Sequence, residues 1–346
     1  MGDDYFARVK KETRTRLWVN NPTVAETDLA LKHGAVCCTT NPTYGSNMLR
    51  RDREFALGVI DDCLGESKND SVVAELVQQR LAARILDRFR PVYEETEGAL
   101  GYVSIQGDPF ADIDAHHIVE EARRSRAVAP NVIAKIPVTA AGLKAIGTLV
   151  GEGVPVIATE VFGIPQMIET CEVYRRASEK SGKKPTFFVT HITGIFDMYL
   201  KRELVEPLRI KIAPETLDKA GLAVARKQYR IFKERGYEGI MLAGGARGTH
   251  HFTGLVGGEV HITINWSTAE EILALDPPVD DGLSVDTPDA DIEELCEKLP
   301  DFRKAWDEDG LSVGEFASYG PVQRFRRQFI NGWDQLLEAI RGRRQG

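Results

Sequence analysis

Lys135 is the residue whose type and position point most directly to chemistry. It stands in the segment Asn131–Val138, in which residues 132–138 are otherwise apolar, and lysine is rarely buried without a reason. If its side chain points into a dry interior, burial disfavours the ammonium, the pKa falls and the amine becomes a nucleophile. A neutral amine attacks a ketone carbonyl and forms a Schiff base. The alternative is a lysine that faces the helical layer and reaches water along it.

Further polar residues stand where other apolar runs end. A buried polar side chain needs a hydrogen-bonding partner, so such positions are candidates for a site. In a barrel of parallel strands these ends meet at one face, where barrel enzymes hold their active sites. The polar or glycine-rich ends include Asn20, Thr39, Thr40, Asn41, Gln106, Thr159, Glu160, Thr190, His191, Gly245, Arg247 and Asn265.

Eight short runs rich in Val, Ile, Thr or Phe alternate with longer amphipathic segments. The short runs are typical of strands and the long ones of helices. Because crossovers between parallel strands are right-handed, eight such units predict an α/β fold, a (β/α)8 TIM barrel. The expected strands are 17–19, 35–40, 102–105, 132–136, 154–159, 186–190, 239–243 and 260–264, and the expected helices include 23–33, 72–89 (ending before Pro91), 113–126, 140–150, 164–180 and 214–235.

The chain is longer than the roughly 250 residues that such a barrel needs. The alternation breaks at Asp276-Pro277-Pro278, and an acidic stretch follows to Asp291. We therefore expect a barrel catalytic domain over residues 1–275 and a C-terminal helical extension over residues 276–346. Two helices, at 291–300 and about 320–341, should pack on the barrel.

The composition excludes several classes of protein. The chain has 346 residues, 42% of them hydrophobic, and a net charge of −8. This composition does not fit a disordered chain or a membrane protein, and the acidic balance gives no reason to expect nucleic acid as a partner. The five cysteines form no framework and should be reduced. With no apolar leader before Leu17, we expect a cytoplasmic protein, for which a homo-oligomer is one option.

Several segments, in order, resemble those of the transaldolases and the related fructose-6-phosphate aldolases. Thr39–Pro42 is similar to the family's signature after strand two, and Val132–Thr139 to the segment that bears its Schiff-base lysine. Gly153–Thr159 and the tail from Phe325 to Leu337 resemble the strand-five segment and the C-terminal helix of the longer transaldolases. The resemblance implies a (β/α)8 barrel that acts on a sugar or sugar phosphate without a cofactor.

The resemblance also implies roles for individual residues. Lys135 matches the imine-forming lysine, Asn41 the asparagine that binds donor hydroxyls, and Thr159 the threonine that holds a catalytic water. The signature adds Thr39 and Thr40, Thr190 stands where the family has a serine, and Arg247 matches a phosphate-binding arginine beside Gly245 in a glycine-rich turn. Gln106 stands where transaldolases have Glu and the aldolases Gln, Asn20 where an Asp is usual, and Ile195 where an arginine grips phosphate.

An amide at position 106 cannot transfer a proton, so another group must do so if the chemistry is retained. The candidates are His191, Glu160 and the pair His250 and His251. Regular alternation along strand five places Glu160 outside the barrel if Thr159 points inside. We expect no metal site, since the paired histidines should point apart, and His116 and His117 should lie at the surface.

These residues suggest a transaldolase-like transferase that moves a three-carbon dihydroxyacetone unit from a ketose to an aldehyde. One alternative is a simple aldolase, which releases the unit by protonation, and Gln106 favours it. Another is a Schiff-base enzyme for a different carbonyl compound. The last is a sugar-binding barrel that has lost catalysis.

Overall fold

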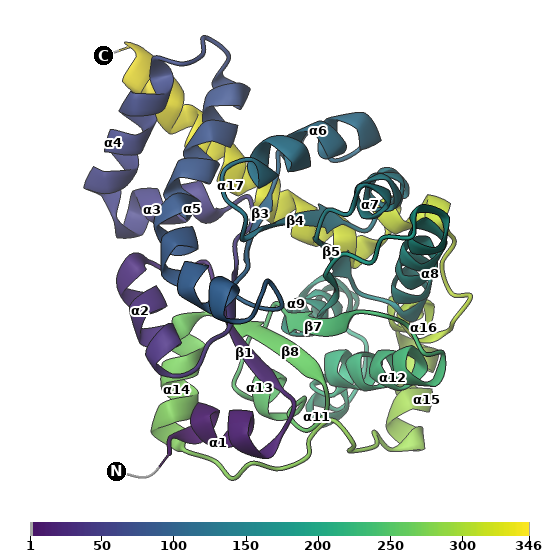
Figure 1. The fold of residues 1–346 in the computed structure, drawn as a ribbon. Coiled ribbons are helices and arrows are strands. Elements are labelled where there is room, and N and C mark those ends of the chain that lie inside the picture. The colour runs from purple at the N-terminus through teal and green to yellow at the C-terminus, as the bar shows by residue number, and fades with distance from the viewer. Residues whose placement is uncertain (1–2, 346) are drawn as a thin grey trace.

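The computed structural model describes residues 3–345, and its centre is a closed barrel of eight parallel strands in sequential order (Figure 1). The predicted (β/α)8 fold is therefore confirmed, and each expected strand lies within two residues of an observed one. The strands are β1 (Arg16–Asn20), β2 (Cys37–Thr39), β3 (Val103–Gln106), β4 (Val132–Pro137), β5 (Val156–Val161), β6 (Phe187–Ile192), β7 (Ile240–Gly244) and β8 (Val260–Ile264).

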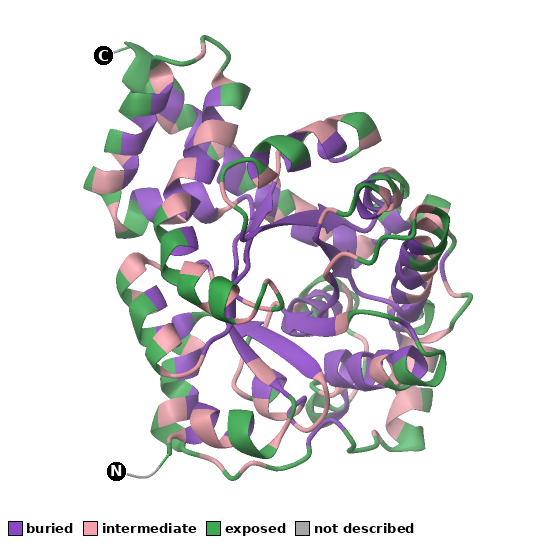
Figure 2. Ribbon diagram, in the orientation of Figure 1, coloured by how far each residue is buried: buried purple, intermediate pink, exposed green. Residues whose placement is uncertain are grey.

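Large side chains fill the half of the barrel near the amino ends of its strands, so that the interior is a packed core there and is open only at the carboxyl end. Trp18 packs edge-on against Phe188, with ring centroids 4.9 Å apart, and donates a hydrogen bond to His261 Nδ1 at 2.9 Å. The strands are almost entirely buried (Figure 2). The residues of this interior cluster are Trp18, Val36, Cys37, Tyr102, Ile133, Ile157, Phe188 and Leu242.

Amphipathic helices surround the barrel and bury their apolar faces against the outer side of the strands. Thr23 and Glu26 form a reciprocal capping box at the start of the first of these helices, and Gly153, at φ +85°, ends the helix that follows β4. The main outer helices are α2 (Val24–Lys32), α5 (Asp70–Glu95), α6 (Ala115–Arg126), α7 (Ala140–Glu152), α8 (Ile164–Ser181), α12 (Ala220–Glu234) and α14 (Trp266–Leu275).

Two predicted helix boundaries are wrong. Helix α5 does not end before Pro91 but runs through it to Glu95; the missing backbone hydrogen bond is tolerated because the preceding turns are held by a long buried face. The single helix expected over 214–235 is divided into α11 (Pro214–Leu217) and α12. Asp291 stabilises the break by accepting hydrogen bonds from Thr216 and Lys219.

Several helices were not predicted, because they lie in loops or before the first strand. Two of them, α3 and α4, follow β2 and carry part of the barrel mouth. Among them are α1 (Tyr5–Glu12), α3 (Tyr44–Arg51), α4 (Arg53–Leu64), α9 (Thr193–Tyr199), the π-helix η1 (Leu200–Val205), α10 (Glu206–Leu208) and α13 (His250–Thr253).

The C-terminal part folds as α15 (Asp289–Lys298), α16 (Pro300–Trp306), the 3-10 turn η2 (Val313–Ser318) and α17 (Gly320–Gln345). Helix α17, yellow in Figure 1, runs along one end of the barrel and contacts α3, α4, α5 and α9. It buries Phe325, Phe329 and Trp333. This long helix is thus part of the barrel's covering, whereas the domain boundary at residue 276 stays a prediction.

Two further observations concern the whole described chain. All five cysteines are free, and four of them are buried, as expected for reduced thiols. Among the helices of residues 3–345, none combines the length and the apolar character that crossing a membrane requires.

Candidate active site

Lys135 points into the barrel and not toward the helical layer. Ile133, two residues earlier and on the same face of β4, belongs to the barrel interior. The lysine side chain is 8% exposed, and its Nζ donates a hydrogen bond to the backbone carbonyl of Thr40 at 3.1 Å. Burial lowers the pKa of Lys135 to about 8, although the nearby Glu160 carboxyl acts in the opposite direction. The lysine is therefore buried inside the barrel, and the alternative, a lysine that reaches water along the helical layer, is wrong.

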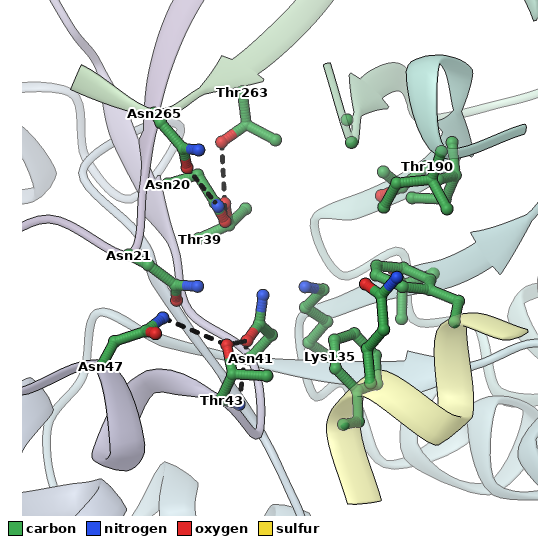
Figure 3. A pocket seen from close by; sticks show the side chains of 18 of the residues that line it. Asn20, Asn21, Thr39, Asn41, Thr43, Asn47, Lys135, Thr190, Thr263 and Asn265 are labelled. Carbon is green, nitrogen blue, oxygen red and sulfur yellow. Dashed lines mark hydrogen bonds between the residues drawn. The ribbon is translucent and has the colours of Figure 1, made fainter. Parts of the chain in front are cut away.

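The Lys135 side chain ends in a polar cavity of about 470 Å³ at the carboxyl ends of the strands (Figure 3). This volume is typical of a small-molecule site. Labelled amide and threonine side chains gather on one side of the cavity, with Thr190 across the gap. The lining residues include Asn20, Asn21, Thr39, Asn41, Asn47, Lys135, Thr159, Thr190, Ile195, Gly245, Arg247, Thr263, Asn265, Phe325, Gln328 and Phe329.

A hydrogen-bonded chain orders the amides near β1. Asn20 accepts a hydrogen bond from Thr39 Oγ1 at 2.9 Å and donates one to Asn265 Oδ1 at 2.9 Å. Asn41 Oδ1 accepts from both the backbone N–H and the hydroxyl of Thr43, at 3.0 and 2.7 Å. Its oxygen is thus occupied, and its NH₂ group is left to donate to a hydroxyl in the cavity.

Three threonines at the strand ends have different surroundings. Thr159 and Thr190 line the cavity, and their hydroxyl oxygens are buried without a hydrogen-bonding partner in the described chain. Thr40 does not line it: its hydroxyl donates to the backbone carbonyl of Ser104 at 2.6 Å. Thr40 therefore contributes its carbonyl to Lys135, and its side chain ties β2 to β3.

Glu160 lies inside, against the expectation from alternation. The pairing of β5 with β6 shifts register between Ala158 and Val161, and Glu160 has a left-handed φ of 64°. Its side chain is buried, and Oε1 accepts a hydrogen bond from Gln106 Nε2 at 3.1 Å. Burial raises the pKa of Glu160 to about 8, opposed by Gln106 and Lys135. The expectation that Glu160 points outward is wrong because a bulge interrupts the regular alternation.

His191 does not line the cavity. It is buried, and its Nε2 lies 3.1 Å from the backbone carbonyl of Gly221. Burial lowers its pKa to about 3, so the ring is neutral at physiological pH. These contacts direct the imidazole to α12 and away from Lys135.

His250 and His251 do not point apart as predicted. Their ring centroids are 3.9 Å apart on the single turn α13, and His251 Nε2 bonds to Asp197 of α9. Together with Asp197 they bring three potential metal ligands within 4.8 Å of one another. Both ring nitrogens of His251 already have partners, since Nε2 lies 2.8 Å from Asp197 and Nδ1 accepts from the backbone N–H of Arg247 at 3.3 Å. The cluster therefore serves as a brace for the turn that carries Arg247. His116 is exposed and His117 partly so, as expected.

The turn after β7 carries Arg247, a positively charged residue that lines the cavity. Gly245 has φ +71°, and a Cβ at this position would lie 2.7 Å from Ile192 and 3.0 Å from Ile195. The Arg247 guanidinium contacts only backbone carbonyls of its own turn, that of Ala246 at 2.8 Å. No carboxylate pairs with it among residues 3–345, so it is available to an anionic ligand.

Sequence reasoning missed the lining residues that come from helices. Arg51 of α3 is paired with Glu26 of α2 and donates to the Asn21 carbonyl at 3.0 Å. Gln328 and Phe329 reach the cavity from α17. These residues follow no strand, and only the docking of their helices on the barrel brings them to the site.

Fold and site together define a (β/α)8 barrel with a buried lysine in a polar cavity at its mouth. The sequence profile of the Transaldolase/Fructose-6-phosphate aldolase family matches residues 17–320. The chain belongs to this family, which is a family of enzymes.

Individual relatives are between 27% and 30% identical to the chain over the aligned residues. Transaldolase 1 of Streptomyces avermitilis is 30% identical over 60% of this chain and 56% of its own length. A transaldolase of Kocuria rhizophila is 27% identical over 57% and 55%, and one of Neisseria meningitidis is 28% identical over 57% and 61%. The chain thus spans little more than half the length of these relatives.

Proposed function

We propose that the protein carries out aldol chemistry of class I through an imine on Lys135. The buried amine in a polar cavity is the observation that carries this proposal. With a pKa of about 8, about one lysine in eleven is neutral at pH 7, against about one in 3,000 for an ordinary lysine. The neutral amine adds to the carbonyl carbon of a ketose, and loss of water gives the iminium.

The iminium then serves as the electron sink. The bond between C3 and C4 of the ketose breaks, its electron pair enters an enamine on Lys135, and an aldehyde departs. We favour transaldolase-like transfer, in which this three-carbon dihydroxyacetone unit adds to a second aldehyde. Phe325 and Phe329 support transfer, since two apolar rings of α17 line the cavity and limit the access of water to the enamine.

The lining of the cavity supports a polyhydroxylated substrate with an anion at one end. The amides of Asn20, Asn41 and Asn265 match hydroxyl groups, and Arg247 matches a phosphate. Ile195 offers no second cation on the same wall. Simple cleavage without transfer remains the second candidate, favoured by Gln106, the residue that the aldolases of the family carry.

Trapping of the imine tests the proposal. The protein is incubated with fructose 6-phosphate, fructose or dihydroxyacetone, reduced with borohydride and digested, and the modified peptide is identified by mass spectrometry. We expect an adduct on Lys135 that Lys135→Met abolishes, whereas Lys144→Met, on an exposed lysine of α7, leaves it unchanged. Product analysis with and without an added aldehyde separates transfer from cleavage. Ligand binding without any adduct would instead support a sugar-binding barrel.

A further inference from the structure

The bulge in β5 places Thr159 in the cavity wall and buries the next residue, Glu160, behind that wall against Gln106. Between Ala158 and Val161, β5 advances three residues while β6 advances two, from Val189 to His191. The extra residue is accommodated by the left-handed conformation of Glu160, which a non-glycine residue rarely adopts. Thr159 therefore keeps its place in the cavity wall while Glu160 turns back toward β3.

Gln106 ties Glu160 to β3, the strand beside the one that carries the imine-forming lysine. Gln106 pairs with Lys135 in the register of β3 and β4, so both side chains emerge on the same inner face. The amide of Gln106 donates to Glu160 Oε1 at 3.1 Å. Glu160 Oε2, Gln106 Oε1 and Thr159 Oγ1 are all buried and have no partner within residues 3–345. One carboxylate oxygen is thus fixed by Gln106, and the other is buried without a hydrogen-bonding partner in the described chain.

The charges around Glu160 come from three elements. Lys135 of β4 and Arg326 of α17 stabilise the carboxylate, and Asp112, in the loop after β3, opposes it. Asp112 is itself paired with Arg326, whose Nε lies 2.9 Å from both of its carboxylate oxygens. Glu160 is therefore a buried carboxyl with no ion-pair partner in direct contact within the described residues, and its charge acts on Lys135, a lysine that must lose and regain protons.

We propose that Glu160 is the group that moves protons during formation and release of the imine on Lys135, a task that the amide at position 106 cannot perform. This inference rests on the proposed function. The position differs from that expected from the family resemblance, in which the carboxylate stands on strand three. Here strand three supplies the amide that orients the carboxyl, and strand five supplies the carboxyl.

The proton balance is complete with these groups. The neutral amine adds to the carbonyl, and a proton moves from nitrogen to oxygen through Glu160 to give the neutral carbinolamine. The protonated carboxyl then gives its proton to the hydroxyl, the C–O bond breaks, and water leaves. Glu160 becomes a carboxylate as the iminium forms. Hydrolysis of the product imine reverses these steps.

The three histidines that were candidates for this task are either engaged in other hydrogen bonds or exposed at the surface. His191 is directed at the Gly221 carbonyl, and His251 is bonded on both ring nitrogens. His250 is exposed on α13. None of the three contacts Gln106 or Lys135 by a hydrogen bond in the described chain.

The experiment measures the rate at which dihydroxyacetone forms a cyanoborohydride-trapped adduct on Lys135 across pH 5 to 10. Because proton transfer contributes about 100- to 10,000-fold, Glu160→Gln should slow adduct formation at pH 7 by at least about 100-fold with an unchanged half-saturating concentration. The double variant Gln106→Glu/Glu160→Gln, which moves the carboxyl to strand three, should form the adduct at least about ten times faster than Glu160→Gln alone. The variants are Glu160→Gln, Glu160→Asp, the double variant Gln106→Glu/Glu160→Gln, and the control Glu121→Gln.

Glu121 is a matched control because it is another buried carboxyl with its pKa raised to about 8, but on α6, where it accepts hydrogen bonds from the backbone N–H of Asp108 and none from Gln106. A Glu160→Gln variant that reacts within about twofold of the parent, or a Glu121→Gln variant that is slowed equally, overturns the inference. If Glu160→Gln does not fold, Glu160→Asp decides: it should keep the parent's pH profile, and a flat profile contradicts the role. Absence of any adduct in the parent refutes the proposed function itself, whereas equal rates in all variants refute only the role of Glu160.

Discussion

Replacing Lys135 by methionine should make the protein more stable at neutral pH while it abolishes imine formation. Folding lowers the pKa of this lysine from 10.5 to about 8. Each pKa unit corresponds to about 1.4 kcal/mol, so keeping the ammonium buried at pH 7 costs about 3 kcal/mol. Methionine has a similar shape and no charge, and it relieves this cost.

The sign of the pH dependence follows from proton binding. Between about pH 8 and 10.5 the unfolded chain holds a proton on Lys135 that the folded protein has lost, so the stability of the parent rises with pH in this window. The advantage of Lys135→Met is therefore fully present below about pH 8 and disappears by about pH 10.5.

Urea unfolding and calorimetry at pH 7, 8, 9 and 10 measure this effect. For 346 residues, a gain of about 3 kcal/mol corresponds to a rise in Tm of about 4 °C. Lys144→Met, on the surface of α7, should show no such pH-dependent difference. A Lys135→Met variant that is less stable than the parent at pH 7, or whose stability differs from the parent's by the same amount at every pH, would refute the placement of a destabilised ammonium in the barrel.

Three further predictions concern the surroundings of the site. Gly332→Ala should lower the free energy of unfolding in urea by about 1–3 kcal/mol, since the added Cβ would lie 2.8 Å from Thr43 Cγ2. In the control Gly342→Ala, in the same helix, the added Cβ meets nothing within 4 Å, and the variant should be more stable by about 0.5–1 kcal/mol. Equal effects of the two substitutions would contradict the close packing of Gly332 on Thr43. Arg247→Ala should raise KM for fructose 6-phosphate by at least about tenfold and leave that for dihydroxyacetone unchanged; a parallel rise for both would exclude a phosphate contact. Arg326→Leu removes a cation that lowers the pKa of Glu160, so the pH at which adduct formation declines should move upward, and a downward shift would contradict the placement of Arg326 beside this carboxyl.

The sequence was sufficient to predict the barrel and most of the strand-end residues. The spacing of apolar residues that distinguishes a strand from a helix is a local property of the sequence. Eight alternations of strand and helix then predict a closed parallel sheet. Lys135 was a candidate for the interior because a single charge in an otherwise apolar strand is costly to bury unless the protein uses it, and the family resemblance favoured this placement over one that faces the helical layer. The same local reasoning identified Asn41, Thr159 and Arg247 as neighbours in space, since each follows a different strand.

What the sequence could not predict depends on contacts between distant segments. Glu160 was expected outside because alternation assumes a regular ladder, and the bulge is visible only in the pairing of β5 with β6. The brace between His251 and Asp197 requires the packing of α13 on α9. Phe329 reaches the cavity because α17 docks across the barrel. The apolar period of residues 320–345 predicts a helix but not the place on the barrel where it docks.

Helix α17 also has a consequence for the order in which the protein matures. The barrel strands end at Ile264, whereas the helix that places Phe325 and Phe329 at the cavity begins only at Gly320. During synthesis, the segment bearing Lys135 thus leaves the ribosome well before the chain that covers it. Until α17 is made and docks, the cavity around Lys135 lacks the wall that Phe325 and Phe329 form.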